Sequence, residues 1–226
     1  MSPQQQSAPP SPAPPPTRAQ AYVLAITWFP GFCELLPAVP ECRHPTAYQT
    51  SHFALHGLWP AGEYCGVSDA LRSTDLAGRW DRLPAIELTD PTWTRLRGEM
   101  PGTRSHLERH EWIAHGSCSG ATAEVFFRRA AELVAAINDS PVRDLFEINI
   151  GLDLTREQVR TAFDKAFGSG TGKRVRLGCE NLDGHRTIDE LTINLYGDAM
   201  GGDPLKTLIA AARTRGSGCD AGLVDR

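Results

Sequence analysis

Residues 53–60 read Phe-Ala-Leu-His-Gly-Leu-Trp-Pro, and this short segment is the most informative one for the fold. Period-two alternation over Ser51–His56 predicts a strand whose large apolar side chains point into the core. The alternate positions, His52 and His56 among them, then lie on the opposite face. A strand that buries one face and presents histidines on the other is suited to form one wall of a functional site.

Residues 110–118 read His-Glu-Trp-Ile-Ala-His-Gly-Ser-Cys and follow a helical pattern. The pattern predicts a helix over Thr103–His115 that Gly116 ends. At about 100° per residue, the polar positions from His110 to His115 span about 140° of one face, and aromatic and aliphatic side chains cover the other. We therefore expect an amphipathic helix whose polar face lines a groove.

The other expected elements place helices between the strands. They are a strand over Tyr22–Trp28, a helix over Thr122–Ile137, a helix from a Thr155/Gln158 capping box to about Phe167, strands at Val175–Cys179 and Leu191–Leu195 around an Asp183-Gly184 turn, and a last helix from Pro204. Strands that pair with near neighbours, together with these helices, predict an α+β fold with an antiparallel sheet and several packed helices.

Six cysteines, none of them in a CxxC pair, favour disulfide bonds over a zinc ribbon or a redox-active dithiol. Several pairings are open, and the shortest consistent set is Cys33–Cys42, Cys65–Cys118 and Cys179–Cys219. Disulfides persist in oxidising compartments. We therefore expect a secreted or periplasmic protein, with the signal peptide absent from this chain because its first 20 residues contain no apolar segment.

Residues 1–20 contain seven prolines and almost no large apolar side chain, so we expect a disordered leader followed by one domain over residues 21–226. No stretch of the sequence is long and apolar enough to span a bilayer, and no membrane partner is expected. The formal net charge is −4, so a nucleic acid would have to be bound by a local cationic cleft. We expect the protein to be a monomer.

Three histidines lie in the two stretches described first, and their chemistry suggests a reaction. Histidine both takes and gives a proton near neutral pH. RNA carries its own nucleophile, the 2′-hydroxyl. Two histidines on opposite sides of a phosphodiester would remove that proton and protonate the 5′-oxygen, which leaves a 2′,3′-cyclic phosphate without a metal or a covalent enzyme intermediate.

Both stretches resemble signatures of the ribonuclease T2 family, FxxHGLWP for residues 53–60 and HEWxKHGxC for residues 110–118. They stand in the family's order, and a looser similarity extends over residues 21–226. The resemblance implies a disulfide-stabilised, T2-like fold and an endoribonuclease that cuts single-stranded RNA through a 2′,3′-cyclic phosphate. It implies no metal and no cofactor.

The resemblance also assigns roles to matching positions. His115 is expected to be the general base, His56 the general acid, His110 a phosphate ligand, Glu111 a residue that polarises the phosphoryl group, and Trp59 a platform on which a base stacks. A further candidate for substrate binding is His52, which shares the predicted strand face of His56.

One position departs from the family signature, because Ala114 stands where the signature has lysine. The helical projection places Ala114 in the middle of the polar face, so an ammonium group there would face the phosphoryl group. Loss of one such electrostatic partner typically costs about 10²–10³ in rate. His52, Arg43 or His44 could supply a substitute cation, and a lysine restored at position 114 is expected to raise kcat.

Three other interpretations compete with this one. A zinc protease would need histidines four residues apart on one helix face, whereas His110 and His115 are five apart. Residues 116–120 resemble a nucleophile elbow, but Cys118 is needed for a disulfide and no strong strand precedes it. The main alternative is a ribonuclease-like RNA-binding or inhibitory module with weakened catalysis, which Ala114 motivates.

Overall fold

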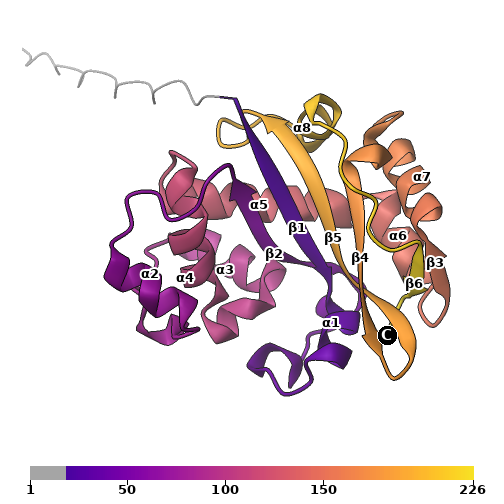
Figure 1. Cartoon of the computed structure of the whole chain (residues 1–226), viewed down its shortest axis with the longest axis horizontal. Helices are drawn as coiled ribbons and strands as arrows, with labels where there is room; N and C mark the ends of the chain where they lie inside the picture. The colour runs from indigo at the N-terminus through magenta and orange to yellow at the C-terminus, as the bar shows by residue number, and fades with distance from the viewer. Residues whose placement is uncertain (1–18) are drawn as a thin grey trace, which may run out of the picture.

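The computed structural model describes residues 19–226 (Figure 1), so the predicted disordered leader falls almost entirely outside the described residues. The fold is α+β and carries the three expected disulfides, Cys33–Cys42, Cys65–Cys118 and Cys179–Cys219. The α-helices are α1 (Phe29–Leu35), α2 (Asp69–Leu76), α3 (Asp90–Glu99), α4 (Leu107–Ala114), α5 (Ala123–Asn138), α6 (Pro141–Ile148), α7 (Arg156–Phe167) and α8 (Leu205–Ala211). The strands are β1 (Gln20–Trp28), β2 (Phe53–Pro60), β3 (Asp153–Thr155), β4 (Val175–Leu182), β5 (His185–Gly197) and β6 (Ala221–Leu223). Within residues 19–226, no helix is long and apolar enough to cross a membrane.

The six strands form one sheet in the order β2-β1-β5-β6-β3, with β4 also paired to β5. Strand β1 lies between β2 and β5 and is antiparallel to both, as expected for an antiparallel sheet, but its pairing with β5 joins segments that are far apart in the sequence. Strands β4 and β5 form a hairpin that turns at Asp183 and Gly184, both of which have the positive φ that the Asp-Gly turn requires. The sheet departs from antiparallel pairing where β6 meets β5 in parallel.

The core lies between one face of this sheet and the helices behind it. Leu24 and Ile26 of β1 are fully buried there, together with Leu191 and Ile193 of β5. Helix α5 buries the predicted stripe of Phe126, Ala130, Leu133 and Ile137. In Figure 1, α5 runs behind the strands, whereas α2, α3 and α4 lie beyond β2. This arrangement places α4 next to the strand that carries the first histidine motif.

Strand β2 contains one residue more than its pairing with β1 can accommodate. Ala25 and Ile26 are neighbours on β1, but their partners on β2 are Gly57 and Leu55. His56 is therefore the extra residue of a β-bulge. Bulges often redirect a side chain next to a functional site.

The bulge changes which side chains of β2 share a face. Residues three apart in a regular strand, such as His56 and Trp59, point to opposite faces. Here their ring centroids are 5.3 Å apart, while Leu58 is fully buried. The bulge thus brings the second half of the motif into phase with His56.

The second motif is not the single helix predicted over Thr103–His115. A 3-10 helix, Pro101–Ser105, is separated from α4 by His106, which adopts a left-handed conformation with φ 62°. Helix α4 ends at Ala114, and His115 is its C-cap residue with φ −120° and ψ −53°. The helical projection therefore does not apply to His115, because the turn after the helix sets the direction of its ring.

Candidate active site

Strand β2 and the end of α4 bring His56, His110, Glu111 and His115 together, as the sequence predicted. Oε1 of Glu111 lies 3.9 Å from Nε2 of His56 and 4.0 Å from Nε2 of His110. The ring centroids of His110 and His115 are 5.9 Å apart. One carboxylate therefore lies between histidines from two distant segments of the chain.

A disulfide and a backbone hydrogen bond hold these two segments together. Cys65, in the loop after β2, is bonded to Cys118, the last residue of the second motif. In the same loop the backbone N–H of Tyr64 donates to the carbonyl of Ala114 at 2.8 Å. The end of α4 is thus fixed against the strand that carries His56.

The contact between β2 and Glu111 explains the glycine of the first motif. The indole Nε1–H of Trp59 donates to Oε2 of Glu111 at 2.9 Å. A Cβ atom on Gly57 would lie 2.1 Å from the same oxygen. Because this distance is far below van der Waals contact, any other residue at position 57 would displace the carboxylate.

Glu111 is nearly inaccessible, with only 1% of its surface exposed. Burial raises its pKa to about 7, against the lowering effects of His56, His110 and the Trp59 hydrogen bond. Its Oε1 atom has no hydrogen-bond partner among the described residues. A carboxyl that is partly neutral near pH 7, with a buried oxygen between two histidines, can orient their imidazoles and adjust their charge.

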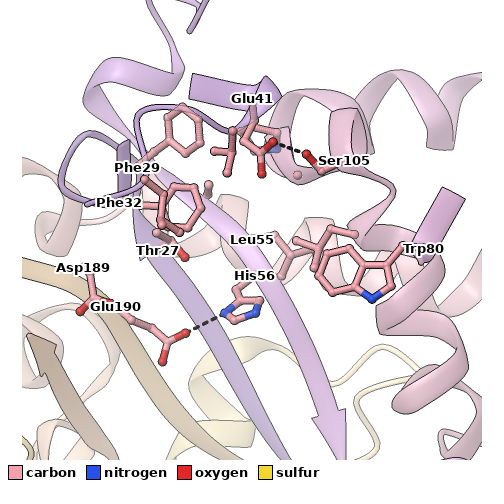
Figure 2. A pocket seen from close by; sticks show the side chains of 16 residues that line it. Thr27, Phe29, Phe32, Glu41, Leu55, His56, Trp80, Ser105, Asp189 and Glu190 are labelled. Atoms are coloured by element: carbon pink, nitrogen blue, oxygen red, sulfur yellow. Dashed lines mark hydrogen bonds and ion pairs between the residues drawn. The ribbon is translucent and has the colours of Figure 1, made fainter. Parts of the chain in front are cut away.

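His56 is held by a residue that sequence analysis missed. Its Nδ1 atom lies 2.8 Å from Oε1 of Glu190 on β5, and Figure 2 shows the two side chains meeting across the sheet. Because a carboxylate only accepts, Nδ1 carries the proton and Nε2 is left facing Glu111. Glu190 pairs with Thr27 of β1, and a second bulge, at Asp189 in the pairing of β5 with β4, lies next to it.

The surroundings of His56 favour its protonated form. Burial lowers its pKa, but the hydrogen bond to Glu190 and the charges of Glu111 and Glu190 outweigh that effect, so that the pKa is raised. The side chain nevertheless remains 39% exposed, so a substrate can reach it. His56 is therefore an accessible proton donor.

The surroundings of His115 have the opposite effect. Burial, followed by the charges of His110 and His56, lowers its pKa to about 4. Its Nδ1 atom is buried, and nothing in residues 19–226 hydrogen-bonds to it. The Trp59 ring lies near both histidines, with its centroid 5.5 Å from that of His115. His115 is therefore neutral under conditions in which His56 holds a proton.

His110 is oriented by three residues that the sequence did not single out. Its Nδ1–H donates to the buried carboxylate of Asp75 at 2.9 Å, and the hydroxyl of Tyr64 donates to the same carboxylate at 2.8 Å. The ring of Trp80 stacks on the imidazole with centroids 4.8 Å apart. These contacts direct Nε2 of His110 toward Glu111.

The geometry and the motifs agree with what comparison with known proteins shows. The sequence model of the Ribonuclease T2 family matches residues 19–203. The chain belongs to the ribonuclease T2 family. It is therefore an RNA-cleaving endonuclease.

Individual relatives are similar over different shares of their length. Ribonuclease I of Escherichia coli is 29% identical over 209 residues, which cover 79% of this chain and 76% of that protein. A ribonuclease of Aeromonas hydrophila is 34% identical over 113 residues, covering 50% of this chain and 43% of the relative. The self-incompatibility-associated SF11-RNase of Nicotiana alata shares the fold, with a TM-score of 0.59 at 18% identity, covering 92% of this chain and 99% of its own.

The expectation that Ala114 lies open in the groove of this T2 ribonuclease is wrong. Only 2% of its surface is exposed, because the Tyr64 loop packs against the end of α4. A longer side chain at this buried position would crowd the atoms around it. The rise in kcat expected from a lysine at position 114 stays a prediction, and a side chain of this size at so buried a position is expected to lower stability through overpacking.

The cations suggested as substitutes for the lysine lie elsewhere in this T2 ribonuclease. His52 stacks on Tyr48 with centroids 3.9 Å apart, and its Nδ1 atom lies 2.9 Å from the Tyr48 carbonyl oxygen. Arg43 donates to the carbonyl of Ala38 in its own exposed loop, and the side chain of His44 is exposed beside it. The structure does not bring these three residues to the histidine cluster, so the substrate-binding role proposed for His52 finds no support.

The spacing argument against a shared metal site also needs correction. His110, Glu111 and His115 offer ligand atoms that all lie within 4.8 Å of one another. The helical projection had kept the two histidines apart, but His115 lies beyond the end of α4 and folds back toward His110. The spacing of these residues in the sequence therefore does not keep their ligand atoms apart.

Proposed function

We propose that this T2 ribonuclease cuts single-stranded RNA by transphosphorylation, with His115 as general base and His56 as general acid. The observation that carries the proposal is the opposite effect of their surroundings on the two pKa values, lowered to about 4 for His115 and raised for His56. Pairs of titratable groups with pKa values pushed apart are typical of acid–base catalysis.

In the proposed reaction, the neutral imidazole of His115 accepts the proton of the 2′-hydroxyl, and the oxygen attacks the adjacent phosphorus. The bond from phosphorus to the 5′-oxygen breaks, and that oxygen takes a proton from His56. The products are a 2′,3′-cyclic phosphate and a free 5′-hydroxyl. Hydrolysis of the cyclic phosphate by water would exchange the two roles.

His110 and Glu111 are proposed to stabilise the charge that develops on the phosphoryl oxygens. The buried Oε1 of Glu111 lies between the Nε2 atoms of His56 and His110, which supports an action of this carboxyl on the phosphate through the two imidazoles. Donors that are fixed before the reaction need no reorganisation in the transition state. His110 and Glu111 would thus act in place of the lysine that the family signature has at the position of Ala114.

Trp59 is proposed to contribute to substrate binding by base stacking, as its place in the motif implies. Its hydrogen bond to Glu111 and its contacts with His56 and His115 support a second role, which is to hold the acid and the base at a fixed separation. The three disulfides support a secreted or periplasmic location for the enzyme.

The proposal is tested by digesting single-stranded and duplex RNA in excess EDTA and analysing the new ends. We expect undiminished cleavage, 2′,3′-cyclic phosphate termini, and slower cutting of duplex, where base pairing holds the backbone away from in-line geometry. Activity that is lost in EDTA and restored by zinc would instead assign a catalytic metal to the cluster formed by His110, Glu111 and His115. Tight RNA binding without cleavage would favour the weakened binding module.

A further inference from the structure

A cavity of about 360 Å³ opens directly beside His56 (Figure 2). Phe32 and Leu36 form one wall, and Trp80 and Leu107 contribute to the other. An apolar, aromatic-lined cavity next to the acid–base pair has the shape and chemistry to take a planar nucleobase, because bases splayed from single-stranded RNA stack on such side chains.

The charged side chains of the cavity exclude a phosphate. Glu41, Asp189 and Glu190 line it, and the described lining residues include no lysine or arginine. A phosphate would be repelled by these carboxylates, whereas the donor groups of a neutral base would be attracted. The phosphate of a bound nucleotide is thus left at the histidines, with its base in the cavity.

Glu41 is fixed in the cavity wall with one oxygen free. It is only 7% exposed, and the hydroxyl of Ser105 donates to its Oε2 atom at 2.5 Å, as Figure 2 shows. Its own carbonyl accepts from Arg104 at 3.2 Å, and the neighbouring Cys42 is bonded to Cys33 of α1. The carboxylate is therefore held in place before substrate binds, and Oε1 is available to accept a hydrogen bond.

We propose that Glu41, assisted by Ser105, makes this ribonuclease prefer guanine in the nucleotide that follows the scissile bond. Guanine presents two adjacent donors, N1–H and the 2-amino group, to the carboxylate and the hydroxyl. Adenine and cytosine present one amino group beside a ring acceptor. Uracil presents a single N–H between two carbonyl oxygens, which the carboxylate repels.

The position relative to the cut rests on the proposed function. His56 lines the cavity and is the proposed donor to the 5′-oxygen leaving group. The base in the cavity therefore belongs to the nucleotide that carries this oxygen. A nucleoside 5′-monophosphate mimics that nucleotide, since its phosphate can lie at the histidines while its base enters the cavity.

The test compares kcat/KM for the dinucleotides ApG, ApA, ApC and ApU. We expect ApG to be cut roughly 10- to 100-fold faster than ApU, the range typical of a well-placed pair of hydrogen bonds to a base. Glu41→Gln should remove most of this ratio, because a neutral amide can also donate to the carbonyls of uracil. Glu34→Gln, which makes the same change of charge at an exposed position of α1, should leave the ratio unchanged.

A ratio of one in the wild type, or a ratio unaltered in a folded Glu41→Gln variant, would overturn the proposal. If that variant does not fold, Ser105→Ala takes its place and should also lower the ratio; an unchanged ratio would count against the proposal equally. Calorimetric titration with 5′-GMP and 5′-UMP separates the proposed base preference from the proposed catalytic mechanism. Tighter binding of 5′-GMP that depends on Glu41 would support the base preference even if no dinucleotide were cut, in which case the proposed catalytic mechanism alone would fail.

Discussion

The two halves of the active site are built in opposite ways. His56 stands on a bulged strand, is partly exposed, and is hydrogen-bonded to Glu190, so its pKa is raised. His115 caps the end of a helix, lacks a hydrogen-bond partner at its buried Nδ1 among the described residues, and has its pKa lowered to about 4. We propose that these opposite surroundings make one imidazole the acid and the other the base.

The groups between the two halves hold His56 and His115 in these different surroundings. Glu111 and Trp59 lie between the halves and contact both, while the Cys65–Cys118 disulfide ties the loop after β2 to the end of the second motif. A carboxylate hydrogen-bonds to His56 directly, whereas the Nδ1 atom of His115 has no such partner among the described residues. Each histidine's role therefore depends on the network and not on the residue alone.

Removing either histidine should have the largest effect on the rate of RNA cleavage. We expect His56→Ala and His115→Ala each to lower kcat for RNA cleavage by about 10²–10⁴, the usual contribution of a positioned proton-transfer group. His52→Ala, which alters a histidine away from the site, serves as the control and should keep wild-type activity. Near-wild-type rates in both central variants would mean that the acid and base are other residues.

The sequence predicted the site residues because both motifs are contiguous and rich in histidine. The α5 stripe and the Thr155 capping box were also predictable because each depends on local spacing, and the three disulfides were predictable because the cysteines pair in the order of the sequence. Even the bulge left a signal, because the buried apolar residues Leu55 and Leu58 are out of phase for a regular strand.

The partners of the histidines could not be predicted in the same way. Asp75 lies in a polar helix that looks solvent-exposed in sequence, and Glu190 reaches His56 only through strand pairing across β1. The short elements α1, α2, α3, α6, β3 and β6 also went unpredicted, although α6 carries local helix signals in its Ser140 cap and in Pro141. The error at Ala114 has a similar cause, since the loop that covers it comes from another part of the chain.

Cutting the tether between the halves should have the next largest effect. Replacing Cys65 and Cys118 together by serine opens a loop with a sequence separation of 53 residues, which should cost roughly 4 kcal/mol of unfolding free energy in the chain-entropy model. Denaturant unfolding measures this loss, and the Cys33→Ser/Cys42→Ser variant, with its much shorter loop, should lose less. Equal losses would show that the long tether has no special role.

Removing the charge of Glu190, the partner of His56, should bring the pKa values of His56 and His115 closer together. Glu190→Gln keeps a hydrogen-bonding group but removes the charge, so the pKa of His56 should fall. Because the acid must be protonated, the alkaline limb of the pH–rate profile should move to lower pH, with a loss of about tenfold on that limb for each unit. Glu180→Gln, an exposed change on β4, should leave the profile in place; an unmoved alkaline limb in Glu190→Gln would contradict the pairing.

The smallest effect is expected from Trp59→Phe, which keeps an aromatic ring but removes the donor to Glu111. The buried carboxyl would lose its hydrogen bond, at a cost of about 1–3 kcal/mol in unfolding free energy. A few-fold fall in kcat should accompany it as the spacing of acid and base loosens. Unchanged stability and unchanged kcat together would show that the indole N–H does not hold Glu111.

The difference between the halves can be measured directly by NMR titration of the histidine ring protons in the wild-type enzyme, with His56→Ala and His115→Ala used for assignment. We predict that His115 titrates near pH 4 and that His56 titrates above its ordinary value of 6.5. The rate of RNA cleavage should then rise with pH through the first transition and fall through the second. Two histidines that titrate together near 6.5, or in the reverse order, would contradict the assignment of His115 as base and His56 as acid.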